Sequence, residues 1–305
     1  MTQKRFDGVI VPMITPVTEQ GRIDLAAVEK IVEHLVSHHT HPFILGTTGE
    51  SASVPESYRA EFVKVMVNTT GRRALTYAGI SGNCLDTAVH SANRYFELGV
   101  DAVVAHAPGY YPIHDEQILY YYERLLEQIE GPLILYNIPP VTNLSLSLDI
   151  VEKLSHHPKV AGFKDSEQNR DRLAKALKLW AGRGDFSYFT GWAAVSAETI
   201  LNGGIGMVPS AGNLFPGVFS DLYKAAKSGE REKAMKLQKD ADQIGSAYQD
   251  GFILSEALSS LKCMMHELGL CSPHVLPPLK ELDNEKKKLV MDRFHQFKDK
   301  YLWHD

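Results

Sequence analysis

The chain has 305 residues, of which 44% are hydrophobic and 23% are charged, and its formal net charge is -5. This composition is that of a globular protein with one large or two smaller domains, and the acidic balance argues against nucleic acid or an anionic membrane as a partner. The three cysteines include no CxxC pair, so we expect neither a disulfide framework nor a zinc ribbon. Because the sequence has no apolar run of about 20 residues and no signal-peptide core near its start, we expect a cytoplasmic location.

Short apolar runs recur through the first two thirds of the chain, and each predicts a buried strand. The predicted strands are Gly8–Ile14, Pro42–Leu45, Ala74–Gly79, Ala102–Ala105, Leu133–Tyr136, Val160–Phe163, Phe186–Thr190 and Ile205–Val208. Helical periodicity separates most of them, as in Leu25–Val36, and Asp24 and Asn83 stand where helix caps are expected. Eight alternating strands and helices predict a TIM-type (β/α)8 barrel of the α/β class. The alternative is an open doubly wound sheet, but the first strand is not followed by the GxGxxG turn of that fold.

The last part of the chain contains no strand-like run. We predict the barrel over residues 1–224 and a C-terminal helical region over residues 225–305. The three helices predicted for this appendage are Lys224–Ile244, Phe252–Leu268 and Asn284–Tyr301, with prolines in the link before the last one.

Functional groups of such a barrel lie at the C-terminal ends of its strands. The sixth predicted strand ends at Lys164. An amine that a strand delivers into a desolvated pocket becomes a nucleophile toward carbonyl groups. The alternative is a lysine that extends from the strand end to water.

Other strand ends carry groups that suit the same chemistry. The segment Gly46–Ser51 follows the second strand, and its hydroxyl and backbone N–H groups could hold a carboxylate, although the segment also fits an ordinary glycine-rich turn. Tyr136 ends the fifth strand, either as a proton donor and acceptor or as a core residue. Gly191 and the segment Gly204–Ser210 leave room for a ligand to approach the backbone. An amine, hydroxyl groups and a phenol at one barrel mouth suit a 2-oxo acid.

With these segments in place, the chain resembles the dihydrodipicolinate synthase / N-acetylneuraminate lyase family of pyruvate-dependent class I aldolases. The resemblance covers essentially the whole chain, and its motifs occur in the family's order. They are Gly46–Ser51 (GTTGES), Tyr110-Tyr111, Tyr136–Pro139 (YNIP), Gly162–Ser166 (GFKDS) and Gly203–Ser210.

The resemblance implies catalytic roles for individual residues. Lys164 would form an imine with pyruvate or another 2-oxo acid, and Tyr136 would move protons to and from it. Thr47 and Thr48 would bind the carboxylate of the 2-oxo acid. Thr48 would also belong to a hydroxyl relay with Tyr136, which Tyr111 of a neighbouring subunit would complete.

The resemblance also implies the surroundings of the imine and the state of assembly. The carbonyl of Val208 would face the imine, and Gly191 and Ser166 would be among the substrate-binding residues. The protein would be a homotetramer built as a dimer of dimers. It would need no metal ion and no organic cofactor, because the lysine itself supplies the electron sink.

Two positions depart from the family's named activities. In the synthase pattern an arginine after YNxP grips the second substrate's carboxylate, and here that position is Val141, which cannot make a charge-assisted bond. In the sialic acid lyase pattern an acidic pair follows the strand-seven glycine, and here Trp192 is followed by Ala193 and Ala194. We therefore predict aldol cleavage or condensation of a 4-hydroxy-2-oxo acid or a 2-oxo-3-deoxy sugar acid. The alternatives are 4-hydroxy-tetrahydrodipicolinate synthase proper, a sugar-acid dehydratase and a 2-oxo acid binding protein without turnover.

Overall fold

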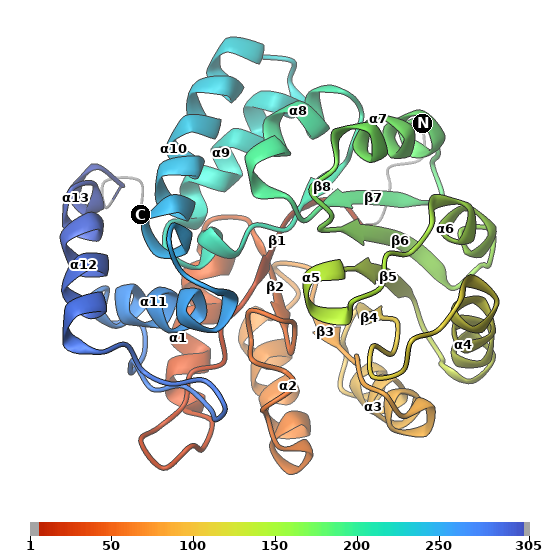
Figure 1. Ribbon diagram of the computed structural model, residues 1–305, viewed down its shortest axis with the longest axis horizontal. Coiled ribbons are helices and arrows are strands. Elements are labelled where there is room, and N and C mark those ends of the chain that lie inside the picture. The colour runs from red at the N-terminus through yellow and green to blue at the C-terminus, as the bar shows by residue number, and fades with distance from the viewer. Residues whose placement is uncertain (1–5, 302–305) are drawn as a thin grey trace.

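A computed structural model describes residues 6–301, and within them eight parallel strands close into a barrel (Figure 1). Each strand pairs with the next one in chain order, and β8 returns to pair with β1. The strands are β1 (Gly8–Pro12), β2 (His41–Ile44), β3 (Tyr77–Gly79), β4 (Ala102–His106), β5 (Leu133–Asn137), β6 (Val160–Asp165), β7 (Ser187–Thr190) and β8 (Gly206–Met207). The predicted TIM-type barrel and its eight strands are confirmed, and the closed sheet excludes the open doubly wound alternative.

Helices surround the barrel and continue beyond it as a C-terminal group (Figure 1). They are α1 (Leu25–Ser37), α2 (Glu56–Thr70), α3 (Leu85–Glu97), α4 (Asp115–Gln128), α5 (Pro139–Thr142), α6 (Leu148–Leu154), α7 (Arg170–Trp180), α8 (Ser196–Leu201), α9 (Pro216–Lys227), α10 (Arg231–Gln249), α11 (Leu254–Glu267), α12 (Asn284–His295) and α13 (Lys298–Tyr301), with short 3-10 turns at Ala193–Val195 and Ser210–Asn213. No helix within residues 6–301 is both long and apolar enough to cross a membrane.

The helical appendage is confirmed, but its first predicted helix, Lys224–Ile244, is wrong. Lys224 lies in α9, which contacts β1 and α8 of the barrel, and α10 starts only at Arg231. Gly229 lies between the two helices with φ +76°, a left-handed conformation that ends a helix and that glycine adopts without strain. The predicted boundary at residue 224 therefore falls inside α9. The last predicted helix is divided at Gln296–Phe297 into α12 and α13.

The strands are apolar on both faces because each lies between the barrel interior and the surrounding helices. A large outer cluster fills the space between the sheet and the helices. A smaller cluster fills the barrel interior, and its buried members are Phe6, Ile10, Phe43, Tyr77, Ala102, Val104, Ile134, Tyr136, Phe189 and Val208. The barrel is therefore packed, and a reaction site can form only at its mouth.

Two predicted helix caps have different outcomes. The Asp24 side chain accepts a hydrogen bond from the backbone N–H of Ala27 at 3.1 Å and caps α1 as predicted. Asn83 does not cap α3, whose N-cap residue is Cys84. The Asn83 side chain instead accepts a hydrogen bond from the backbone N–H of Tyr110 at 3.2 Å, so it holds the loop between β4 and α4.

Candidate active site

Three functional side chains lie in one row across neighbouring strands. Strand pairing aligns His106 in β4 with Tyr136 in β5, Tyr136 with Lys164 in β6, and Lys164 with Phe189 in β7. Alternate residues of a strand face the same side of a sheet, and both Tyr136 and Phe189 belong to the interior cluster. The row therefore brings an imidazole, a phenol and an amine together near the C-terminal ends of the strands.

The amine of Lys164 is buried among aromatic rings. The residue is only 6% exposed, and its Nζ lies 3.8 Å from the ring centre of Tyr136 and 5.3 Å from that of Phe43. Among residues 6–301, no carboxylate lies within ion-pair distance of this Nζ. A lysine that extends to water does not fit this burial. A desolvated amine with no carboxylate beside it suits attack on a carbonyl carbon.

The phenol of Tyr136 contacts the loop that follows β2. Its hydroxyl lies 3.3 Å from Oγ1 of Thr47, at hydrogen-bond distance. The expected contact was with Thr48, which is buried but makes no hydrogen bond to the phenol within the described residues. Adjacent residues of a tight turn need not share a partner, and the hydroxyl contact of Tyr136 is with Thr47. The hydroxyl pair in the structure is therefore Thr47 with Tyr136.

The loop after β2 is a compact turn rather than an extended segment. The backbone N–H of Gly49 donates to the carbonyl of Gly46, and that of Glu50 donates to the carbonyl of Thr47, each at 3.1 Å. A side chain at position 49 would place its Cβ 2.9 Å from the carbonyl oxygen of Met13, so only glycine fits there. Glu50 has φ +54°, which is uncommon for a residue with a side chain.

A polar network outside the barrel joins the ends of β5 and β6. Asp165 follows Lys164, and its carboxylate accepts hydrogen bonds from Asn137 Nδ2 at 2.9 Å and from Arg172 Nε at 2.7 Å. Burial raises the pKa of Asp165, while Arg172 and the hydrogen bonds oppose the change. Because Asn137 and Asp165 directly follow Tyr136 and Lys164, their contact fixes the two catalytic candidates relative to each other.

His106 is a member of the row that was not among the predicted site residues. The predicted strand ended one residue earlier, at Ala105, although a histidine at the end of an apolar run was the available signal. Burial lowers the pKa of His106, and the charge of Lys164 lowers it further, while a hydrogen bond to Ala107 acts against both. Nδ1 lies 2.8 Å from the carbonyl of Ala107, which can only accept, so Nδ1 carries the proton. The neutral ring then presents Nε2 as an acceptor.

Three further predicted site residues are Val208, Gly191 and Ser166. Val208 lines a small cavity together with Lys164 and Phe43. A Cβ at Gly191 would lie 2.1 Å from Oγ of Ser166, so the absence of a side chain at position 191 makes room for Ser166.

Tyr111 lies on the surface of the single chain, unlike the buried Tyr136 and Lys164. It is 69% exposed, its neighbour Tyr110 is 74% exposed, and their ring centres are 5.0 Å apart at an angle of 87°. The structure of the single chain therefore leaves both rings on its surface, beside the mouth of the barrel.

Two features at the mouth are available to a second substrate. A pocket with a volume of about 510 Å³ is lined by Val141, Thr142, His106 and Ser81, among other residues. On another side of the mouth, the Trp192 ring lies 5.5 Å from the guanidinium carbon of Arg170, which also pairs with Glu198. The side chain at position 141 is aliphatic and 40% exposed, so it brings no charge to this pocket, and the charged residues in the lining are Glu56 and Arg59.

A closed (β/α)8 barrel with a buried lysine amine beside a phenol at its mouth has the architecture of a class I aldolase. A sequence model of the dihydrodipicolinate synthetase family matches residues 5–297. The chain belongs to this family, and it is a pyruvate-dependent class I lyase.

Individual relatives extend over the same length. The 4-hydroxy-tetrahydrodipicolinate synthase of Methylococcus capsulatus is 28% identical over 292 residues, which are 95% of this chain and 98% of that protein. The dihydrodipicolinate synthase structure from Bacteroides thetaiotaomicron has a TM-score of 0.90 and 30% identity, covering 96% of this chain and 99% of the other. A prophage protein of the same family from E. coli K12, solved in complex with pyruvate, has a TM-score of 0.90 and 25% identity, with coverage of 96% and 99%.

Proposed function

We propose that Lys164 forms an imine with pyruvate or another 2-oxo acid and that the enzyme makes or breaks a carbon–carbon bond beside this imine. The observation that carries the proposal is the buried amine of Lys164, 3.8 Å from the ring centre of Tyr136 and without a carboxylate partner in the described chain. The amine attacks the ketone carbon and water leaves. Loss of a methyl proton then gives an enamine, which adds to an aldehyde, and water finally releases the product and the free lysine.

The neighbouring residues have complementary roles in this proposal. The Tyr136 hydroxyl transfers protons, and Thr47 extends the hydroxyl path toward the mouth, supported by their 3.3 Å contact. Thr48 and the backbone N–H groups of its turn bind the carboxylate of the 2-oxo acid. The carbonyl of Val208 and the side chain of Ser166, which Gly191 leaves room for, complete the substrate site.

The second substrate follows from the groups at the mouth. Val141 cannot bind a carboxylate by charge, and Trp192 is followed by two alanines instead of acidic residues. The neutral His106 ring offers an acceptor, which matches a hydroxyl group rather than an anion. We therefore propose a 4-hydroxy-2-oxo acid or a 2-oxo-3-deoxy sugar acid as the substrate of cleavage or the product of condensation.

One specific observation favours a second candidate function. The relative from Methylococcus capsulatus, matched over 95% of this chain, is a 4-hydroxy-tetrahydrodipicolinate synthase. Such an activity would condense pyruvate with aspartate semialdehyde, whose carboxylate would need a cationic partner. Val141 stands where the family pattern has that partner, so this candidate ranks second.

Assembly is part of the proposal. We place Tyr111 of a neighbouring subunit in the hydroxyl path, within a homotetramer arranged as a dimer of dimers. Two adjacent exposed tyrosines beside the mouth support this placement, because exposed aromatic pairs are typical of protein interfaces.

Borohydride trapping with pyruvate tests the imine. The expected result is one pyruvate-derived adduct, located on the peptide that contains Lys164 by mass spectrometry. It should disappear in Lys164→Ala and persist in Lys175→Ala, which removes an exposed lysine of α7. A folded protein that forms no adduct on Lys164 would rule out the proposed mechanism.

The substrate is tested by measuring pyruvate release from a series of 4-hydroxy-2-oxo acids and 2-oxo-3-deoxy sugar acids. Release from at least one of them supports the first candidate. Efficient consumption of aspartate semialdehyde with no release from any of these acids would favour the synthase instead.

A further inference from the structure

A fully buried ion pair connects the loop after β2 with the C-terminal helices. Nζ of Lys262, in α11, lies 2.6 Å from Oε1 of Glu50, and each side chain is only 1% exposed. The other carboxylate oxygen of Glu50 accepts the backbone N–H of Leu276 at 2.8 Å, and Nζ of Lys262 also donates to the carbonyl of His274 at 2.7 Å. Burial lowers the pKa of Lys262, and the negative charge of Glu50 opposes this change.

A pair of this kind is weak evidence for stability, because taking both charges out of water costs about as much as their attraction returns. In some proteins such pairs instead select one arrangement of the chain. Glu50 belongs to the same turn as Thr47 and Thr48, and it holds the left-handed backbone conformation described above. Its charged side chain leaves the turn in the direction away from the barrel, toward α11. The ion pair is thus the external anchor of the turn.

The turn has a second anchor on the barrel side. Oγ1 of Thr15, just after β1, donates a hydrogen bond of 2.6 Å to the carbonyl of Gly49. Gly49 therefore lies between the Thr15 contact on one side and the Glu50 ion pair on the other. Two adjacent residues held from opposite sides leave the preceding threonines little freedom to move.

We propose that Lys262 and Glu50 are positioning residues that hold the turn Gly46–Ser51, and with it Thr48 and the backbone N–H groups, in the geometry required to bind the carboxylate of the 2-oxo acid. The inference rests on the carboxylate-binding role proposed for this turn and adds a role for the C-terminal helices in it. Neither charged side chain reaches the substrate, since both are buried behind the turn. Removal of the pair should therefore weaken recognition of the carboxylate while the Lys164 amine stays reactive.

The test compares pyruvate with methyl pyruvate, which has the same ketone but no carboxylate charge. The variant is Glu50→Gln combined with Lys262→Met, because removing both charges leaves neither one buried alone. Borohydride trapping is measured on the Lys164 peptide over a range of concentrations of each compound. The preference for pyruvate over methyl pyruvate should fall by about 10- to 100-fold, the effect of losing a hydrogen bond to a charged group.

The matched control removes another ion pair of the same helix. Nζ of Lys286 lies 2.6 Å from Oε1 of Glu256 in α11, and among residues 6–301 the Glu256 carboxylate accepts hydrogen bonds from Lys286 and Ile253 rather than from the turn. Glu256→Gln with Lys286→Met should leave the preference for pyruvate unchanged. Two outcomes for the Glu50/Lys262 variant would overturn the proposal. One is an equal decrease in the trapping of both compounds, which would indicate a merely structural pair. The other is an unchanged preference for pyruvate over methyl pyruvate.

Two further results are distinguishable from these. If the Glu50/Lys262 variant does not fold, Glu50→Asp tests whether the pair positions the turn. This substitution keeps the charge but shortens the side chain, so the ion pair can re-form only if the turn moves. A loss of preference in Glu50→Asp supports the proposal, and an unchanged preference overturns it. If the wild-type protein itself forms no pyruvate adduct, the proposed function fails and the positioning role fails with it.

Discussion

Thr47 and Thr48 are adjacent in the chain, yet they have different neighbours and should have different kinetic effects. Only Thr47 lies within hydrogen-bond distance of the Tyr136 hydroxyl. Proton transfer by positioned groups contributes about 10²–10⁴-fold to a reaction rate. We expect Thr47→Val to lower kcat by about tenfold or more and Thr48→Val mainly to raise the KM for pyruvate. Steady-state kinetics with varied pyruvate concentration measures both effects.

Serine at either position keeps the hydroxyl group and removes only a methyl group, so Thr47→Ser and Thr48→Ser serve as matched controls. Each should recover most of what its valine counterpart loses. A larger loss of kcat in Thr48→Val than in Thr47→Val would contradict the hydroxyl path seen in the structure and return the relay to Thr48.

Single residues also show what the sequence could predict about the site. Lys164 and Tyr136 could be found because each ends an apolar run, and a barrel places all strand ends at one mouth. The orientation of the two threonines could not be found, because it depends on how a turn folds rather than on a periodic pattern. His106 was missed for a different reason: strand ends are uncertain by a few residues, and the predicted strand stopped at Ala105.

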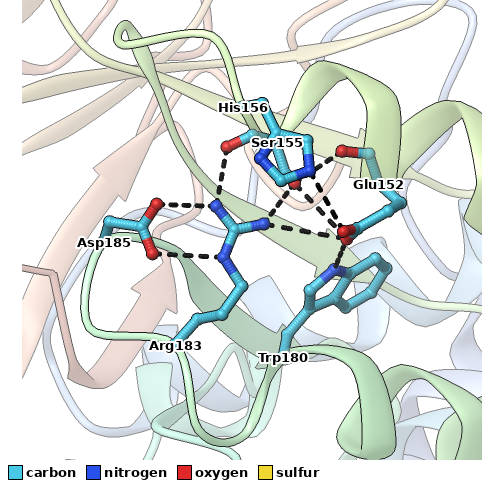
Figure 2. A network of polar contacts seen from close by, with 6 residues as sticks. All are labelled: Glu152, Ser155, His156, Trp180, Arg183 and Asp185. Carbon is cyan, nitrogen blue, oxygen red and sulfur yellow. Dashed lines mark hydrogen bonds and ion pairs between the residues drawn. The ribbon is translucent and has the colours of Figure 1, made fainter.

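At the scale of elements, the end of the barrel opposite the mouth is held by a polar network between α6 and α7 (Figure 2). Arg183 follows α7, and its guanidinium donates to the hydroxyl and the carbonyl of Ser155 and to the carboxylate of Asp185. Glu152 of α6 accepts a hydrogen bond from the indole of Trp180 and lies 3.7 Å from Nη1 of Arg183. These residues precede β6 and β7 in the chain, so the network lies at the N-terminal face of the barrel. That face of a (β/α)8 barrel serves stability rather than catalysis.

We therefore expect Arg183→Met to lower the free energy of unfolding by about 1–3 kcal/mol, because the polar partners at Ser155 stay behind without a donor. Urea denaturation monitored by circular dichroism measures this change. Asp185→Asn is the matched control, since the Asp185 side chain is 70% exposed and an ion pair to a carboxylate in water contributes about 0–1 kcal/mol. Trapping of pyruvate on Lys164 should be unchanged in both variants. A selective loss of pyruvate binding in Arg183→Met would contradict a purely stabilising role.

Elements differ in how well a pattern predicts them. The strands were found because buried parallel strands are short, apolar and separated by long helical segments. The first appendage helix was misplaced because the helical periodicity runs on through Ser228–Glu230, and only the left-handed Gly229 interrupts it. The ion pair of Glu50 with Lys262 could not be predicted, because its partners lie far apart in the chain and no local pattern relates them.

At the scale of the whole molecule, the proposed assembly makes each site depend on two chains. Tyr111 is exposed in the single chain, and within the described residues the hydroxyl partner of Tyr136 is Thr47. If it acts in the site of a neighbouring subunit, two differently inactivated chains can complement each other. In a dimer of Lys164→Ala with Tyr111→Phe, the site that retains Lys164 receives Tyr111 from the other chain and is fully intact. The other site of that dimer lacks both groups.

Mixing the two inactive variants after dissociation and reassociation should therefore restore activity. Random pairing makes half of the dimers mixed, each with one intact site of two, so roughly a quarter of the wild-type activity is expected. The control is the same procedure applied to each variant alone, which should restore nothing. If Tyr111 instead acts within its own chain, no mixed dimer contains an intact site, and the mixture would show only the average of the two variants. Activity near a quarter of the wild-type value would then distinguish a site shared between subunits from one complete in each chain.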